Sequence, residues 1–574
     1  MKKRLLILAL AVIMCFSIVA CSDQKAETPE NSKQPASETA GKDVKEPSAE
    51  DGPFTPYEET ITLTYGKDVN PSEQLGEGET HEVNQYTRHI LNELNIETKT
   101  YWQVAQGQDS LQKINLAIAS NDLPDAMVVN STQLYQLVKS DQLADLTDVY
   151  ETYASDTIKY TMDTAGDIAK NSVTFDGKMM AIPAVNVPED GYHFMWVRQD
   201  WLDKLNLPVP KTVEDLKNVA KAFVEQDPDG NGENDTIGLA GPANGGKLFA
   251  NFLFPTNNLM GFDAFFGAFQ SYPGYWLDDG NGNAVYGSLL PETKSALAEL
   301  ANMYKAGLID PQMGVRKDAN EEVVGGKCGL FLGVWWMGYW PFPDAWANDP
   351  EADFQAYPLY AEDGNTYFHM GTPSTTFCVV RKGYEHPEAA MKIANLYCRD
   401  EGVFDQSISQ IGNYPLRVPI TPYDELKFTT QAVKDVLNGE KTLDDYSDFE
   451  KKIYRHLTHD TETAPLVKLE PLDEMGIKNW DLNGDSNVNR LYSMLVGCRP
   501  IYDEATNKKE VFSLIYSQTD SMASRWANLE KIEQEAFMKI IMGKEPIEYF
   551  DTFVQEWLKQ GGEKITAEVQ EARK

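Results

Sequence analysis

The sequence has little cysteine, little histidine and none of the short motifs that often accompany catalysis. Only six cysteines and seven histidines occur in 574 residues, and the cysteines show no CxxC pairing typical of zinc sites. No GxSxG, HExxH or P-loop pattern is present. These absences disfavour α/β-hydrolases, zinc peptidases and P-loop nucleotide hydrolases. With 88 acidic residues, a catalytic pair of carboxylates such as that of a glycosidase remains an alternative.

Long apolar runs are missing too, with one exception at the start of the chain. Three cations at positions 2–4 precede an apolar run at residues 5–20. This run is too short for a comfortable transmembrane helix and has the form of a secretory signal. Residues 1–20 are therefore predicted to be a signal peptide.

The end of this run, Ile18-Val19-Ala20-Cys21, resembles the lipobox of bacterial lipoproteins. In that family the signal is cleaved before the cysteine, which then carries the lipid. The resemblance implies lipidation of Cys21 and a protein anchored at the extracellular face of the cell membrane. An ordinary signal peptide with an incidental cysteine is the alternative.

Residues 21–57 contain mostly Glu, Lys, Ser, Pro and Ala and almost no sizeable hydrophobic side chain. Such a segment cannot bury enough apolar surface to offset the entropy lost on ordering. We predict a disordered stalk that separates the body from the membrane.

The formal net charge of −37 limits the partners of this protein. A field of that sign repels nucleic acid and anionic lipid, so neither is expected as a partner, and only the lipid on Cys21 would contact the membrane. A polyanionic ligand would need local cations in its site. The remaining cysteines, Cys328, Cys378, Cys398 and Cys498, are consistent with buried thiols or with one or two disulfides.

The body alternates between extended and helical patterns, which predicts an open α/β sheet. Its length of about 515 residues exceeds that of one simple core and indicates two or more lobes. Expected strands lie at 61–65, 96–104, 126–129, 178–185 and 192–197. Expected helices lie near 86–94, 110–119, 213–224, 290–306 and from about 513 to 561, with a hairpin turn at 278–283.

Several short motifs in this order resemble the extracellular solute-binding proteins, family 1, of ABC importers. They are ASNDLPD at 119–125, Asp176-Gly177 before Ala181-Ile182-Pro183, VRQDWL at 197–202, ETK at 292–294 with YKAGLID at 304–310, and Gly561-Gly562. More closely, the chain is similar to LplA-type lipoproteins of Gram-positive bacteria and to alginate-oligosaccharide-binding proteins.

This resemblance implies a two-lobed periplasmic-binding-protein-like fold of type II, with a hinge between the lobes. Lobe one is expected to contain 58–190 and about 373–430, and lobe two 191–372 and about 431–574 with the C-terminal helices. The ligand would lie between the lobes, and the closed form would dock on the permease subunits of an ABC importer. A monomer is expected.

An acidic loop predicts a structural calcium ion. Oxygen-bearing side chains recur at positions 1, 3, 5 and 9 of the loop, a glycine lies at position 6, and position 7 can offer a carbonyl. The loop departs from an EF-hand at position 12, where Gly238 replaces a bidentate glutamate, and an Asp/Asn/Gly-rich turn without metal is the alternative. The expected ligands are Asp227, Asp229, Asn231, Glu233 and Asp235. The stretch 481–487 is a weaker candidate.

Seven aromatic residues fall within positions 331–346. So many rings, interrupted by glycine and proline, would not all fit in one core, and rings at a cleft wall form platforms on which sugar C–H faces stack. Predicted ligand contacts are Trp335, Trp336, Tyr339 and Trp340.

Other predicted contacts follow from the expected crossings between lobes. They are Tyr192, Trp196, Arg198 and Ser374. Arg198 could pair with the carboxylate of an acidic sugar, or else with a neighbouring aspartate.

These observations favour a lipid-anchored protein that captures an oligosaccharide and delivers it to an ABC importer, with no enzymatic activity. The alternative is a surface-anchored glycosidase or lyase, which would need a pair of carboxylates or a base at a defined separation.

Overall fold

The computed structural model describes residues 51–573 apart from 70–74, 106–107, 244–245, 257, 406–407, 468–474 and 482–485. The chain divides into two units, Met1–Asp51 and Gly52–Lys574, and the description below concerns the second. The predicted signal peptide, Cys21 and most of the predicted stalk lie outside the described residues. Part of the weaker metal candidate at 481–487 does so as well.

The largest sheet among the described residues has five strands in the order β2-β1-β3-β13-β6. Strand β1 runs parallel to β2 and β3, whereas β13 runs antiparallel to both β3 and β6. Alternate side chains of β1, those of Leu63, Tyr65 and Lys67, are buried, as expected for a strand covered on one face. The strands are β1 (Ile61–Val69), β2 (Ile96–Ala105), β3 (Ala126–Asn130), β6 (Ile182–Pro183) and β13 (Thr376–Val380).

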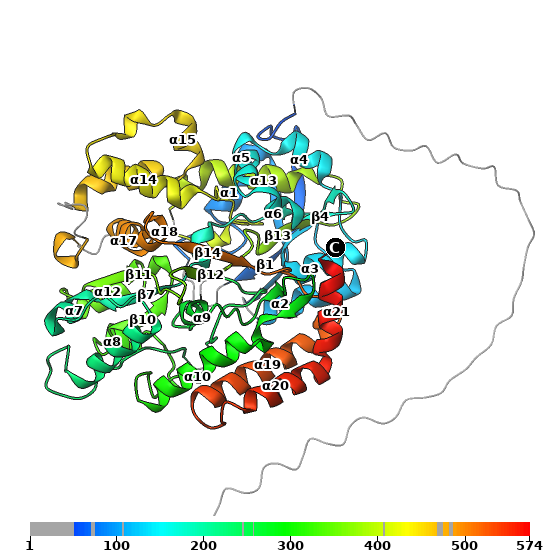
Figure 1. The fold of residues 1–574 in the computed structure, drawn as a ribbon. Helices are drawn as coiled ribbons and strands as arrows, with labels where there is room; N and C mark the ends of the chain where they lie inside the picture. Colours follow the sequence, from blue (N-terminus) through cyan, green and yellow to red (C-terminus); the bar gives the residue numbers. More distant parts are fainter. Residues whose placement is uncertain are drawn as a thin grey trace, which may run out of the picture. The chain divides into compact units, whose positions relative to one another are not determined.

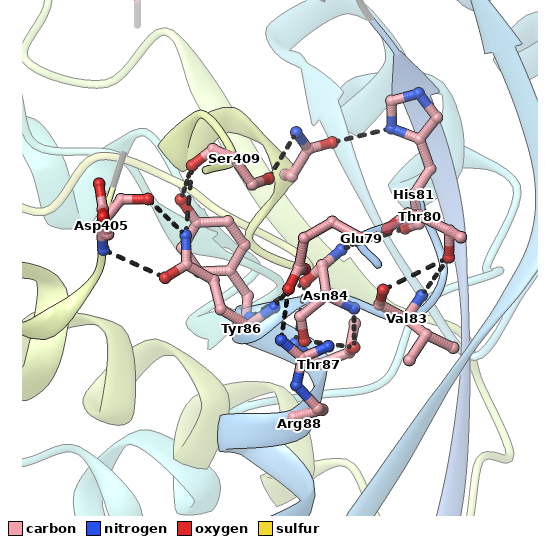
Figure 2. Close-up of polar contacts among 12 residues, drawn as sticks. Glu79, Thr80, His81, Val83, Asn84, Tyr86, Thr87, Arg88, Asp405 and Ser409 are labelled. Atoms are coloured by element: carbon pink, nitrogen blue, oxygen red, sulfur yellow. Dashed lines mark hydrogen bonds and ion pairs between the residues drawn. The ribbon is translucent and has the colours of Figure 1, made fainter. Parts of the chain in front are cut away.

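Helices connect and cover these strands. Helix α1 begins at a capping box in which the Asn84 side chain accepts from the Thr87 amide and the Thr87 hydroxyl accepts from the Asn84 amide (Figure 2). The helices of this part are α1 (Gln85–Leu94), α2 (Gln108–Ser120), α3 (Ser131–Lys139), α4 (Thr147–Tyr153), α5 (Asp156–Thr164), α6 (Gly166–Asn171) and α13 (Glu388–Asp400). A small hairpin is formed by β4 (Thr174–Phe175) and β5 (Lys178–Met179).

A second, antiparallel sheet has the order β10-β7-β11. Its central strand β7 is buried along its whole length, which fits its apolar sequence FMWV. The strands are β7 (Phe194–Arg198), β10 (Leu330–Gly333) and β11 (Phe354–Tyr357). The nearby helices are α7 (Gln199–Leu205), α8 (Val213–Glu225), α9 (Asp263–Ala268), α10 (Pro291–Lys305), α11 (Glu321–Val324) and α12 (Phe342–Asn348).

The remaining elements include two short two-stranded sheets and the C-terminal helices. Strand β12 (Thr366–Met370) pairs in parallel with β14 (Lys508–Phe512), and β8 (Trp276–Asp278) forms a hairpin with β9 (Ala284–Tyr286). The later helices are α14 (Glu425–Leu437), α15 (Asp448–Ile453), α16 (Leu457–Thr463), α17 (Ser486–Tyr492), α18 (Arg499–Tyr502), α19 (Met522–Ile541), α20 (Tyr549–Trp557) and α21 (Glu563–Ala572). Helices α19 and α20 pack against each other (Figure 1).

The apolar core consists of separate clusters that join distant parts of the sequence. Two clusters surround the five-stranded sheet and combine residues before 186 with residues 377–423. Two others surround the second sheet, and they combine residues 187–370 with residues after 425.

The alternation of strands and helices predicted from the sequence is confirmed. The predicted strand at 178–185 is wrong in detail, because the chain forms two strands of two residues there, β5 and β6. The predicted hairpin turn at 278–283 joins β8 and β9.

Candidate functional site

Three parallel strands of the large sheet end at one edge, which we call the carboxyl edge. Val69, Ala105 and Asn130 end β1, β2 and β3 on this side. Strand β13 begins here, because Thr376 pairs with Asn130 in antiparallel register. In open α/β sheets, ligands bind outside the carboxyl ends of the strands. The carboxyl edge is therefore the expected location of a site.

A polar network lies beside the end of β1. The buried Lys67 ammonium donates to the backbone oxygen of Asn413 at 3.3 Å. His81 Nδ1 lies 3.2 Å from the Asn413 side-chain oxygen, and the Asn413 amide donates to the Ser409 hydroxyl at 3.2 Å. Figure 2 shows the last two bonds, which connect His81 to Ser409 through the side chain between them. The network holds residues 409–413 at the carboxyl edge, and no local pattern in the sequence marks it.

Two chain segments lead from the carboxyl edge to the other sheets, and we call them the crossing segments (residues 185–193 and 369–376). The backbone amide and side-chain amide of Asn186 both donate to the Pro373 carbonyl, at 2.9 and 3.0 Å. A Cβ atom on Gly191 would lie only 3.4 Å from the backbone nitrogen of Gly371. The two segments therefore run in close backbone contact.

Four buried side-chain atoms in the crossing segments have no hydrogen-bond partner among the described residues. They are Glu189 Oε2, His193 Nε2, His369 Nε2 and Ser374 Oγ. Burying a polar group without a partner is costly, so such groups usually meet water or a ligand. Burial also raises the pKa of Glu189 to about 7 and lowers that of His369 to about 4. The predicted contact Ser374 belongs to this group.

The aromatic cluster (Trp335, Trp336, Tyr339 and Trp340) adjoins the first crossing segment. The indole N–H of Trp335 donates to Asp190 Oδ1 at 3.0 Å, and this ring is only 6 % exposed. Tyr339 and Trp340 are 38 % and 40 % exposed. The structure thus brings four predicted contacts together, with two rings open to solvent. The other aromatic residues of the predicted stretch, Phe331, Phe342 and Trp346, belong to the core.

A π-helical segment, Ser493–Gly497, packs directly against the aromatic cluster. A Cβ atom on Gly497 would lie 2.1 Å from the Trp335 carbonyl oxygen, and one on Gly338 would lie 2.4 Å from the Ser493 hydroxyl. Only glycine permits this approach at both positions. Single π-helical turns inside helices often occur at functional sites.

Arg490, one turn before this π-helical segment, contacts the exposed side of the aromatic cluster. Its Nε atom donates to both carboxylate oxygens of Asp460, at 2.8 and 3.0 Å, and its Nη1 atom donates to the Tyr339 hydroxyl at 3.2 Å. The Asp460 side chain is 1 % exposed, so the ion pair is largely desolvated. Burial is the largest single influence on the pKa of Arg490 and lowers it. The interactions with Asp460 and Tyr339 together outweigh burial, so the pKa is raised.

Two predicted ligand contacts, Trp196 and Arg198, are buried in β7, whereas the predicted contact Tyr192 lies in the first crossing segment with its side chain buried. Trp196 is fully buried and its indole donates to the Val334 carbonyl, while the Tyr192 hydroxyl is bonded to Glu510. Arg198 is 4 % exposed and forms ion pairs with Asp200 and Asp349. Since β7 is the buried centre of its sheet, side chains on both of its faces enter the core.

The acidic loop brings its predicted side chains close together. The Asn231 amide donates to Asp229 at 2.8 Å and to Asp235 at 3.1 Å, and Asp227 accepts from the Gly230 and Gly232 amides. Partial burial and then the hydrogen bond with Asp227 raise the pKa of Asp229. Carboxylates crowded in this way are the oxygen donors that calcium prefers.

The second half of the loop fits calcium less well. The Thr236 hydroxyl points inward and donates to the Phe223 carbonyl at 2.5 Å, and a Cβ atom on Gly238 would lie 2.5 Å from the Leu308 carbonyl. Lys327 forms an ion pair with Asp235 at 2.8 Å. Among the described side chains, no group of three or more His, Cys, Asp or Glu residues is arranged so that it could hold a metal ion.

The sequence left the state of the four later cysteines open. Cys328, Cys378, Cys398 and Cys498 are all buried free thiols. Burial raises the pKa of Cys328 and Cys378 to about 12 and that of Cys398 to about 11.

The comparison with known families decides what kind of protein carries this site. Residues 92–427, more than half of the chain, match the model of the family described as bacterial extracellular solute-binding protein. This chain belongs to that family. The solute-binding role expected from the sequence motifs is confirmed, and the enzymatic alternative is not supported.

Curated relatives of this solute-binding protein come from Bacillus subtilis and Streptococcus pneumoniae, among others. It is 23 % identical over 507 residues to the polygalacturonan/rhamnogalacturonan-binding protein YtcQ of Bacillus subtilis, covering 84 % of this chain and 88 % of YtcQ. It is also 32 % identical over 177 residues to the fructooligosaccharide transporter protein FusA of Streptococcus pneumoniae. That match covers 29 % of this chain and 32 % of FusA.

Solved structures share the fold of this solute-binding protein. The alginate-binding protein AlgQ2, solved without calcium ion, gives a TM-score of 0.55 at 16 % identity, covering 91 % of this chain and 99 % of AlgQ2. FusA from S. pneumoniae with kestose gives 0.56 at 17 % identity, covering 89 % and 99 %. The predicted α/β fold of solute-binding proteins is confirmed. Within the described ranges, no helix has the length and apolar character needed to cross a membrane.

Proposed function

We propose that this solute-binding protein captures an oligosaccharide between two lobes and delivers it to the permease of an ABC importer. The observation that carries the proposal is the position of the exposed rings of Tyr339 and Trp340 in a cluster bonded to the first crossing segment. Exposed aromatic rings offer flat apolar faces, and the polar atoms of the crossing segments offer hydrogen bonds. A sugar needs both.

The two lobes of this proposal have the boundaries expected from the sequence. Lobe one combines 58–190 with about 373–430, and lobe two combines 191–372 with about 431–574. Four core clusters support this division, because each draws on one of the two sets apart from Val187 and Leu426 near the boundaries. A smaller fifth cluster joins Tyr160 of lobe one to residues 432–457 of lobe two. Closure would occur by rotation about the crossing segments, in the manner of hinged binding proteins.

The relatives support a carbohydrate as the solute. YtcQ and FusA are named for binding polygalacturonan or rhamnogalacturonan and fructooligosaccharide. Cys21 would carry the lipid that anchors the protein at the extracellular face of the membrane, in line with the similarity of part of the chain to the lipoprotein LipO of B. subtilis. A monomer is sufficient, because both lobes belong to one chain.

Calcium is part of the proposal as a structural ion in the acidic loop. Asp227, Asp229, Asn231 and Asp235 would bind it with side-chain oxygens and Glu233 with its carbonyl. A calcium ion would supply positive charge among crowded carboxylates and fix the loop. The inward-facing Thr236 and the glycine at 238 support a weaker site than a complete EF-hand.

A thermal-shift screen of oligosaccharides on the full-length lipidated chain in detergent tests this function. A ligand at a hundred times its Kd adds about 2.7 kcal/mol of stability. For a body of about 520 residues this corresponds to a rise in Tm of roughly 2–3 °C. Chromatography of the recovered sugar must then show it unchanged. A stabilising sugar that is hydrolysed, or a broad sugar panel without any shift, would refute the proposal.

A further inference from the structure

Helix α3 of the proposed lobe one has an apolar face and a polar stripe. Leu134 and Leu137 belong to a core cluster beside the large sheet. Ser131, Tyr135 and Lys139 are spaced four residues apart and therefore lie on another side of the helix, partly or fully exposed. The Lys139 ammonium lies 5.8 Å from the centre of the Tyr135 ring, a cation–π contact within the stripe. The helix thus presents polar groups away from the core of its own lobe.

This polar stripe meets residues 516–520, which belong to the proposed lobe two. The Ser131 hydroxyl donates to the Tyr516 carbonyl at 3.2 Å, and the Lys139 ammonium donates to both carboxylate oxygens of Asp520 at 2.7 Å. At 1.5 Å per residue, the contact extends over about 12 Å of α3. The Tyr516 hydroxyl also donates, at 2.7 Å, to a backbone carbonyl in the second crossing segment. The contact therefore begins beside the crossing segments and continues along α3 away from them.

The contact has the features of an interface that can separate. A hollow of about 260 Å³ lies between α3 and residues 518–523, and polar side chains such as Gln136 and Gln518 line it from both sides. None of the core clusters formed by the described residues combines α3 with residues 516–523. Polar groups that face water lose little when such a contact opens, whereas a shared apolar core would hold the two parts together.

We infer that α3 and residues 516–520 form a latch between the lobes, made when the lobes close and broken when they open. This inference rests on the proposed function and adds a means of regulating it. A solute enclosed between the lobes can leave only after they open, so the strength of the latch would set how long the solute is retained. Lys139 and Asp520 are both exposed, and an exposed ion pair changes an equilibrium by only about 1.5- to 5-fold. The latch is therefore weak enough to open.

Spin labels on the full-length lipidated chain in detergent test the latch without any sugar. Thr152→Cys in α4 and Lys221→Cys in α8 place one label on each lobe, and double electron–electron resonance measures the distance between them. The four described native thiols are buried, and Cys21 would carry the lipid, so the labels react at the two new cysteines. Lys139→Glu places like charges opposite each other and should lower the population at the distance of the structure at least threefold. Adding Asp520→Lys should restore that population.

Matched variants separate the latch from general damage. Lys294 donates to both carboxylate oxygens of Asp551 at 2.7 and 2.8 Å, but this pair joins α10 to α20 within the proposed lobe two. Lys294→Glu should therefore leave the distance distribution unchanged. Ser131→Ala tests the other end of the latch, because it removes one hydrogen bond without changing a charge. It should lower the population at the distance of the structure by about 2- to 10-fold.

The outcomes distinguish the latch from the proposed function. Equal populations in the wild type and Lys139→Glu, or a loss that Asp520→Lys does not restore, would overturn the latch. So would an equal change in Lys294→Glu, or a wild-type distribution without the distance of the structure. The proposed function would stand in each case, because sugar binding is measured separately by thermal shift. If the distance does not change even when a stabilising sugar is added, the lobes do not close, and both the latch and the proposed capture by closure are wrong.

Discussion

Replacing Trp335 by phenylalanine tests the hydrogen bond between the aromatic cluster and the first crossing segment. The change keeps a large ring in a site that is 6 % exposed but removes the indole N–H that donates to Asp190. A hydrogen bond to a charged group contributes about 1.5–3 kcal/mol to the free energy of unfolding. At roughly 2.1 cal/mol/K per residue over about 520 residues, this loss lowers Tm by about 1.5–3 °C.

The loss should depend on pH, and its sign follows from Asp190. Burial raises the pKa of this carboxyl above its ordinary 3.8, whereas the bond from Trp335 lowers it. A group whose pKa is raised in the native state binds protons more tightly there, so stability falls as pH rises from its ordinary pKa to its native pKa. Removing the indole donor raises the native pKa further. The deficit of Trp335→Phe should therefore be larger at pH 8 than at pH 5.

Thermal unfolding followed by circular dichroism at pH 5 and pH 8 provides the measurement. Trp346→Phe is the matched control, because Trp346 is 7 % exposed in the same core cluster and donates to the neutral carbonyl of Ala352. Its deficit should be nearly independent of pH. If the two variants lose equal stability at both pH values, the Trp335 bond does not act through the charge of Asp190.

Three further predictions concern other parts of the body. Gly497→Ala would place a methyl group against the Trp335 carbonyl, so it should lower Tm and abolish sugar binding, with a Tm loss of about 1–3 °C. Gly412→Ala, with open space around its Cβ, should change neither Tm nor binding. Thermal-shift and calorimetric assays measure both effects. Glu533 is buried with a pKa raised to about 8, so the free energy of unfolding should fall as pH rises between about 4.5 and 8. In unfolding titrations, Glu533→Gln should remove up to about 1.4 kcal/mol per pH unit of that slope. An unchanged slope would contradict this prediction. Calcium should raise the Tm of the chelator-treated protein, and Asp229→Asn should weaken this response; no shift at millimolar calcium would remove the metal from the proposal.

Much of the fold was predictable because its signals are local. The buried positions of β1 alternate along the chain, and α1 begins at Gln85 after the N-cap Asn84, whose capping partner Thr87 lies three residues further on. Such patterns depend on neighbours within a few residues, so periodicity and capping rules are sufficient to find them. The predicted strand at 178–185 was wrong in its length, because this stretch forms two strands of two residues each, β5 and β6.

The site was only partly predictable, because its contacts join distant segments. The density of rings at 331–346 predicted ligand contacts at Trp335, Trp336, Tyr339 and Trp340, and this remains a prediction, with Tyr339 and Trp340 exposed. Nothing local to Arg490 or Asp460 marks them, and the pair is separated by 30 residues. The same limit explains Trp196 and Arg198, since a strand beside a predicted crossing can equally be the buried centre of a sheet.

The proposed function gives these long-range contacts a shared physical role. The aromatic cluster is supported on one side by the π-helical segment Ser493–Gly497 and bonded on the other to Asp190 in the first crossing segment. Gly497 and Gly338 bring the cluster and the π-helical segment into close contact. The rings therefore cannot shift unless the π-helical segment or the segment around Asp190 moves as well. A sugar that stacks on Tyr339 and Trp340 would therefore act on the segment about which the proposed lobes would rotate. Trp335 connects the aromatic cluster to the first crossing segment, so removing its hydrogen bond to Asp190 tests this coupling most directly.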